Sequence, residues 1–80
     1  MPRVFEHQGW RFFFYSNEGD PREPAHVHVL KEGREAKFWL YPEVAPAYNH
    51  GLSARELRLV SQVVLERRRD IEEAWHAHFG

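Results

Sequence analysis

The first half of the chain alternates apolar and polar residues in short runs, as half-buried β-strands do. Four such runs occur, at residues 3–7, 10–16, 26–31 and 34–40. The first two flank Gln8-Gly9 and the last two flank Glu32-Gly33, and a two-residue connection that ends in glycine favours a β-hairpin. The pattern therefore predicts two hairpins, which are separated by a polar segment with two prolines over residues 17–25.

Each predicted hairpin implies a register between its strands. The first pairs Glu6 with Arg11, Phe5 with Phe12 and Val4 with Phe13. The second pairs Lys31 with Arg34, Val29 with Ala36, His28 with Lys37, Val27 with Phe38 and His26 with Trp39. Because side chains two positions apart in a strand share a face, the second hairpin separates an apolar face from a face that carries both histidines. This separation supports the register.

The last third of the chain has a helical pattern. Residues 41–52 contain two prolines, a glycine and an asparagine, so we expect a loop there. Ser53 and Glu56 have the spacing of a helix-capping box. Apolar positions then recur at helical spacing, at Leu57, Val60, Val64, Ile71, Trp75 and His78 or Phe79. The pattern predicts one helix from about Ala54 to His78.

These elements predict a single α+β domain over residues 1–80, with the element order ββββα. The two hairpins are expected to form a four-stranded antiparallel sheet, and the one long C-terminal helix is expected to pack on one of its faces. The apolar residues expected beneath the helix are Phe5, Trp10, Phe12, Phe14, Val27, Val29, Ala36 and Phe38.

One helix covers only one face of such a sheet, so we expect the opposite face to be open. This face carries aromatic and polar side chains, and exposed patches of this kind mark interfaces. With two residues of the preceding loop, the expected binding surface consists of Phe13, Tyr15, Asn17, Glu18, His26, His28, Lys37 and Trp39.

Length and composition narrow the class of protein. The chain has 80 residues and no cysteine, which favours a small domain in the reducing cytoplasm. The longest apolar run, residues 12–15, is far shorter than the about 20 residues of a membrane span. A net charge of −1 gives no support for non-specific binding to nucleic acid. Domains this small often gain stability from a metal, a partner or a second copy of the chain.

The His26-Val27-His28 segment is a candidate metal site, because two imidazoles on one face of a strand are able to chelate an ion such as zinc. A third ligand is needed. The candidates are Glu18, Asp20 and Glu23 in the preceding loop, and His7 and His50 elsewhere. The alternative is that the two histidines only hold the loop by hydrogen bonds.

An RNA-directed or metal-dependent hydrolase centred on His26 and His28 is a second candidate. His26 or His28 would act as the general base, and Lys37 or Arg68 would stabilise a phosphate. Tyr15 and Trp39 would stack on bases. The chain has no nucleophile motif, phosphate-binding loop or catalytic triad, so the sequence leaves open whether the protein is an enzyme.

Several segments together resemble a bacterial family known only as domain of unknown function number 4160. They are residues 13–18, the His-Val-His-Val of residues 26–29, and residues 36–39, 51–57 and 73–79. The positions that match the family's signature are Tyr15, Ser16, Asn17, Glu18, Pro24, His26, His28, Lys37 and Trp39. The resemblance implies a small prokaryotic protein, often encoded beside another short protein in what looks like a toxin–antitoxin pair. It implies no catalytic residues.

The leading hypothesis is therefore a partner-binding component of a bacterial toxin–antitoxin-like pair, which acts through the open aromatic and histidine-bearing face of its sheet. The hydrolase is the alternative, with zinc as a candidate cofactor and RNA as a candidate partner. A homodimer that associates through Phe13, Tyr15 and Trp39 is a third hypothesis.

Overall fold

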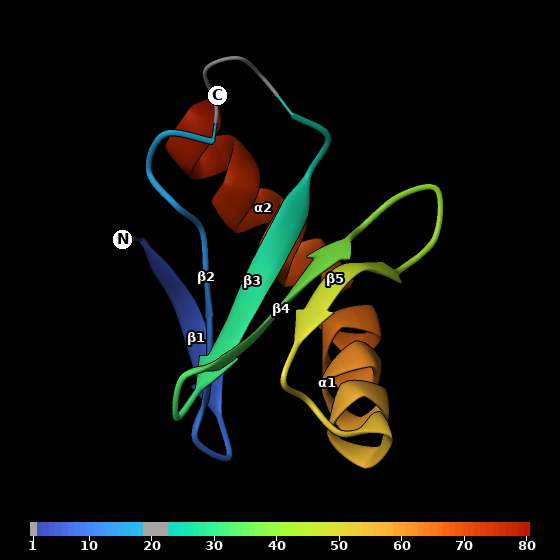
Figure 1. Cartoon of the computed structure of the whole chain (residues 1–80). Coiled ribbons are helices and arrows are strands. Elements are labelled where there is room, and N and C mark those ends of the chain that lie inside the picture. Colours follow the sequence, from blue (N-terminus) through green and yellow to red (C-terminus); the bar gives the residue numbers. More distant parts are fainter. Residues whose placement is uncertain (1, 19–22) are drawn as a thin grey trace.

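The computed structural model describes residues 2–18 and 23–80, which form a five-stranded antiparallel sheet followed by two helices (Figure 1). The strands lie in the sheet in the order β1-β2-β3-β4-β5, so each strand pairs with its neighbour in the sequence. The strands are β1 (Arg3–His7), β2 (Trp10–Phe13), β3 (His26–Lys31), β4 (Arg34–Trp39) and β5 (Ala45–His50). The helices are α1 (Ala54–Glu66) and α2 (Arg68–Phe79).

The prediction of a four-stranded sheet is wrong, because β5 forms within the segment that was expected to be a loop. The prolines of this segment suggested a loop, but β5 is an edge strand of the sheet. Pro46 lies opposite Phe38, next to an irregularity in the pairing with β4. A proline is tolerated at the edge of a sheet and at a bulge, because no ladder hydrogen bond from its nitrogen is needed there.

The hairpin registers follow the prediction closely. All five pairs expected between β3 and β4 are present, from Lys31 opposite Arg34 to His26 opposite Trp39. Between β1 and β2, the pairs Glu6–Arg11 and Phe5–Phe12 are present. The third expected pair is wrong, because a shift in register places Arg3, and not Val4, opposite Phe13.

The prediction of one long helix is also wrong, since the helical segment is broken at Arg67. An unbroken helix over these residues would be longer than the molecule itself. A straight helix from residue 54 to residue 78 is about 37 Å long, whereas the longest extent of the Cα trace is 33 Å. The break lets α2 turn and stay on the sheet. No helix in residues 2–18 and 23–80 is long and apolar enough to cross a membrane.

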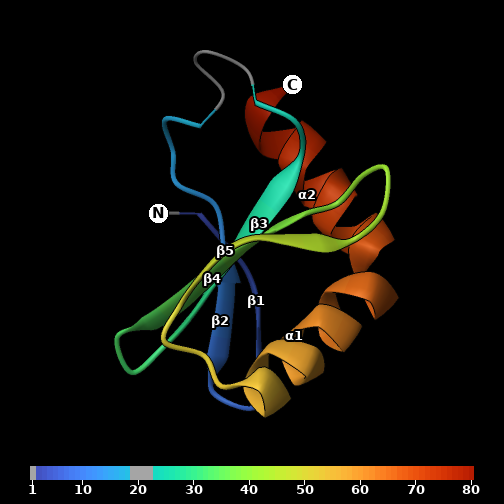
Figure 2. The same ribbon diagram turned by 45° about the vertical axis from the view of Figure 1, so that its right-hand side comes forward.

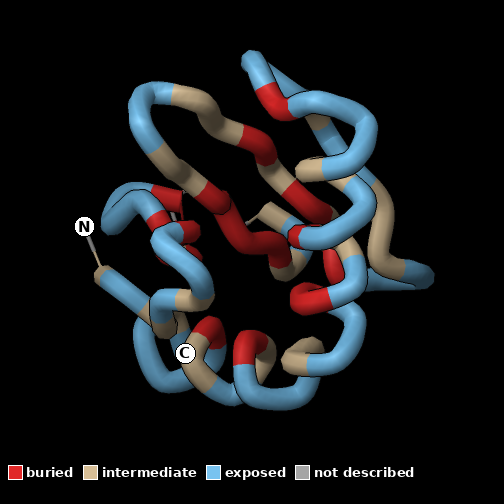
Figure 3. The backbone as a smooth tube through the Cα atoms, turned by 90° about the horizontal axis from the view of Figure 1, so that it is seen from below, coloured by how far each residue is buried: buried red, intermediate tan, exposed pale blue. Residues whose placement is uncertain are grey.

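The two helices lie on the same side of the sheet (Figure 2), and the core fills the space between the two layers. Buried segments face this space and exposed segments face outward (Figure 3). The apolar residues expected beneath the helix all belong to this core or pack against it. From the helices, the core receives Val60, Val63, Val64, Ile71 and Trp75.

Candidate functional site

One carboxylate oxygen lies between the two histidines of β3. Glu18 Oε2 is 2.7 Å from Nε2 of His26 and 2.5 Å from Nε2 of His28. The two imidazoles share a face because they are two positions apart in the strand. A turn after β2 brings Glu18 to them, and the backbone N–H of Tyr15 donates to Glu18 Oε1 at 2.9 Å. We refer to Glu18, His26 and His28 as the Glu–His–His cluster.

The Glu–His–His cluster is buried. His26 is 0% exposed, His28 is 3% exposed and Glu18 is 9% exposed. Aromatic rings surround the imidazoles: the ring centroid of Trp75 is 4.8 Å from that of His26, and the ring of Phe13 stacks on His28 at 5.5 Å. The cluster therefore lies in an environment of low polarity, where unpaired charges are costly.

The second ring nitrogen of each histidine also has a partner. Nδ1 of His26 is 2.9 Å from the backbone carbonyl oxygen of Pro24. Nδ1 of His28 is 3.2 Å from the hydroxyl oxygen of Tyr48 and 3.3 Å from Glu35 Oε2. The Tyr48 hydroxyl donates to Glu35 Oε2 at 2.6 Å. These contacts fix the orientation of both imidazole rings.

Glu18 and Tyr48 of this region have shifted pKa values. Burial alone raises the pKa of Glu18, but the contacts with His28 and His26 and the Tyr15 N–H outweigh burial, so the pKa lies below its ordinary value. Burial and the hydrogen bond to Glu35 raise the pKa of Tyr48 above its ordinary value. At neutral pH, Glu18 is therefore ionised and Tyr48 keeps its proton.

The structure brings together some of the predicted site residues. Of the expected third ligands, Glu18 alone among the described residues forms a group of potential ligand atoms with the two histidines. The ammonium group of Lys37 lies elsewhere, where it donates to Glu23 Oε1 at 3.0 Å and sits over the ring of Trp39. Asp20 lies outside the described residues.

The expectation that this face of the sheet is open is wrong around the histidines. Phe13, Glu18, His26 and His28 are buried, because the chain after β2 folds back over this part of the sheet. Tyr15 and Asn17 are exposed. Lys37 and Trp39 are half-buried.

Sequence reasoning missed the outer partners of the cluster. Tyr48 lies in the segment that was expected to be a loop, and Glu35 was not among the candidate site residues. In the structure, Tyr48 lies opposite Lys37, and Lys37 lies opposite His28, so the three share one face of the sheet. Recognition of β5 as a strand is the signal that would have found Tyr48.

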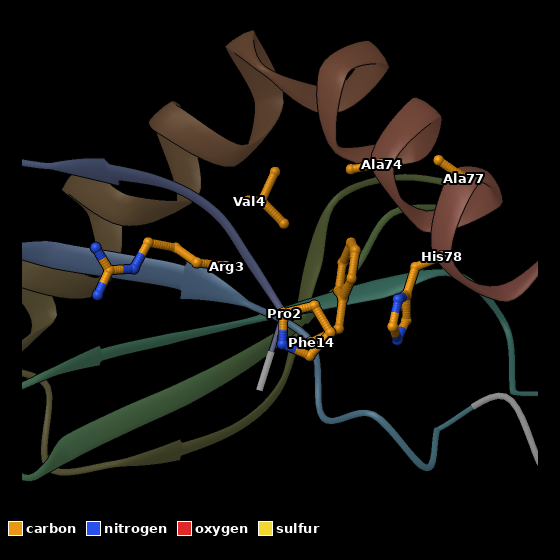
Figure 4. A pocket seen from close by; sticks show the side chains of 7 residues that line it. All are labelled: Pro2, Arg3, Val4, Phe14, Ala74, Ala77 and His78. Atoms are coloured by element: carbon orange, nitrogen blue, oxygen red, sulfur yellow. The ribbon is translucent and has the colours of Figure 1, made fainter.

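Two pockets of the described structure lie away from the cluster. One, of about 280 Å³, lies between the N-terminal strand and α2 (Figure 4). It is lined by Pro2, Arg3, Val4, Phe14, Ala74, Ala77 and His78. A second, of about 300 Å³, lies beside α1 and is lined by Glu43, Val44, Arg58, Ser61, Gln62 and Leu65. Neither pocket includes a residue of the Glu–His–His cluster.

Comparison with known proteins identifies the family. The family described as Domain of unknown function (DUF4160) matches residues 9–76, and the chain belongs to this family. The match includes all residues of the Glu–His–His cluster and both of its outer side chains, Glu35 and Tyr48. No curated protein and no solved structure matches the chain.

Proposed function

We propose that this member of the DUF4160 family is the partner-binding component of a bacterial toxin–antitoxin-like pair in the cytoplasm. In this proposal a small protein binds the side of the sheet that faces away from the helices. The observation that carries the proposal is that both helices lie on the other side of the sheet (Figure 2). Within the described part of the chain, no second layer of helices or strands covers this side.

The proposed docking surface lies on this side of the sheet, across strands β2 to β5, and we call it the outer face. Its members pair across neighbouring strands and are all partly or fully exposed. They are Arg11, Leu30, Glu35, Lys37, Tyr48 and His50. Protein interfaces combine aromatic and apolar groups at the centre with a polar rim, and this surface contains Leu30 and Tyr48 beside charged side chains. Charges of both signs do not favour a nucleic acid, which binds to uniformly basic surfaces.

Burial of His26 and His28 is the reason we favour binding over hydrolysis. A general base needs to reach the proton that it removes, within hydrogen-bond distance or through one water. These histidines are 0% and 3% exposed, and their ring nitrogens already face groups of the protein.

The proposal is tested by co-expression with the short protein encoded beside the chain. We expect the two proteins to co-purify, and Leu30→Lys in the outer face to weaken binding by at least about tenfold, as for an interface residue of moderate importance. Leu65→Lys is the matched control, because Leu65 is 51% exposed on α1, on the other side of the molecule.

Failure of the two proteins to co-purify contradicts the proposal, as does equal binding by the Leu30→Lys variant and the native chain. Measurement of the molecular mass of the chain alone distinguishes a homodimer from a complex with a different protein. If the native chain has twice the mass of one chain and the Leu30→Lys variant has the mass of one chain, the outer face binds a second copy instead.

A further inference from the structure

We infer that Glu18 Oε2, His26 Nε2 and His28 Nε2 form a binding site for one divalent transition-metal ion of the zinc class. The three atoms lie within 4.8 Å of one another. One comes from the turn after β2 and two from β3, so an ion there connects two separate segments of the chain. This inference does not depend on the proposed partner, since the three ligand atoms belong to the buried cluster and not to the outer face.

The contacts of the opposite ring nitrogens decide which nitrogen carries the proton. The carbonyl oxygen of Pro24 only accepts hydrogen bonds, so Nδ1 of His26 donates to it. The hydroxyl hydrogen of Tyr48 is used on Glu35, so the Tyr48 oxygen accepts from Nδ1 of His28. A neutral imidazole carries one proton. In the metal-bound state, with that single proton on Nδ1, each neutral histidine directs an Nε2 lone pair into the cluster.

Two lone pairs and a carboxylate oxygen then converge in a buried space, and they need positive charge between them. Without a metal, a proton on Nε2 supplies it, but a ring that also donates from Nδ1 is then a cation, and the two ring centroids are 5.2 Å apart. For His26 this is a poor solution. Its Nε2 is 2.7 Å from Glu18 Oε2 but has no hydrogen-bond partner among the described residues. A metal ion replaces both protons at one centre.

The ligand set indicates the class of metal. Two imidazole nitrogens and one carboxylate oxygen suit zinc and its neighbours in the first transition row, whereas magnesium and calcium prefer oxygen ligands. Zinc ligands at about 2.0–2.2 Å in a tetrahedron lie roughly 3.3 Å apart. To reach this spacing, Glu18 Oε2 moves away from each nitrogen by less than about 1 Å, and the two Nε2 atoms, now within 4.8 Å of each other, come to the same separation.

The surroundings of the cluster match those of known metal sites. Histidines that bind metals usually donate their other ring N–H to a backbone carbonyl or a carboxylate. His26 does so to Pro24, and His28 does so to the Tyr48–Glu35 pair. The carboxylates of Glu18 and Glu35 together balance the charge of a divalent ion. The same contacts that hold the rings also raise their ability to bind metal.

The test is zinc titration of the purified full chain by calorimetry. We expect one zinc ion per chain. Loss of an outer partner typically weakens metal binding by 10- to 100-fold, so we expect about this loss for Glu35→Gln and about 100-fold or more for His28→Gln and Glu18→Gln. His76→Gln is the matched control, because the His76 side chain is 60% exposed on α2. It should bind zinc as the native chain does.

X-ray absorption spectroscopy of the zinc-loaded native chain keeps the test independent of whether the variants fold. We expect two imidazole nitrogens and at least one oxygen around the metal. A native chain that binds less than about one-tenth of an equivalent of zinc, or a zinc environment without two imidazoles, overturns the inference. So does equal zinc affinity of folded His28→Gln and His76→Gln variants.

Discussion

The two hairpin turns hold residues with side chains in the left-handed region of the backbone. Gln8 has φ 50° and Glu32 has φ 51°, and each precedes a glycine with positive φ. A positive φ at both central residues is the signature of the type I′ turn, which matches the twist of the flanking strands. Asparagine is favoured at the first of these positions, whereas longer side chains are strained there.

Replacement of Glu32 by asparagine should therefore stabilise the protein, by about 0.5 kcal/mol. Urea unfolding at neutral pH measures the change. Glu32→Val is the opposite control, because a β-branched residue fits positive φ poorly and should destabilise the chain. Equal stability of the two variants would contradict a type I′ turn at this position.

At the scale of elements, the N-terminus of α1 forms hydrogen bonds within its own first turn and an ion pair with the sheet. The Ser53 side chain accepts from the Glu56 N–H, and Glu56 accepts from the Ser53 N–H, which completes the predicted capping box. Arg34 of β4 forms an ion pair with the same Glu56 carboxylate. Glu56 therefore connects the helix N-terminus to the strand beneath it.

This connection predicts a dependence of stability on pH. The hydrogen bonds from Arg34 and from the Ser53 backbone hold the pKa of Glu56 below its ordinary value of 4.5. A carboxylate with a lowered pKa in the folded state stabilises the fold above pH 4.5, and this stabilisation is lost as the pH falls through the folded-state pKa.

Urea unfolding at pH 7 and pH 3 should therefore show Glu56→Gln to be less stable than the native chain at pH 7, with a smaller gap at pH 3. Glu73→Gln, on an exposed position of α2, is the matched control and should leave the pH dependence unchanged. A gap for Glu56→Gln of the same size at both pH values would contradict the role of the ion pair.

At the scale of the whole molecule, one core joins the sheet to both helices. Phe12, Val29 and Phe38 of the sheet and Val60 and Ile71 of the helices are all fully buried. A chain of this length has a free energy of unfolding of about 4–12 kcal/mol. The loss of a single large core side chain is therefore a considerable part of the total stability.

Ile71→Ala should lower the free energy of unfolding by about 2–5 kcal/mol, because it leaves a cavity between α2 and the sheet. Leu65→Ala, at an exposed position of α1, should change it by about 0.5 kcal/mol or less. Tryptophan fluorescence and far-ultraviolet circular dichroism should report one shared transition. Separate transitions for helix and tertiary contacts would show that the helices unfold independently of the sheet.

Local interactions explain the parts of this fold that were predictable. The turns, the register of β3 with β4 and the cap at Ser53 all depend on residues close together in the sequence. The alternation of side chains then places His26 and His28 on one face. This made the two histidines a candidate metal site, with Glu18 as one of five candidate third ligands, and the structure selects Glu18 among the described residues.

The tertiary structure decided the rest. Residues 45–50 contain a proline, and they form the strand β5 because they pair with the edge of β4. The helix breaks at Arg67, and Ile71 and Trp75 of α2 then join the same core as the sheet. The burial of His26 and His28, and the contacts of His28 with Glu35 and Tyr48, depend on segments that meet only after folding. Sequence pattern describes neighbours along the chain, whereas these features depend on neighbours in space.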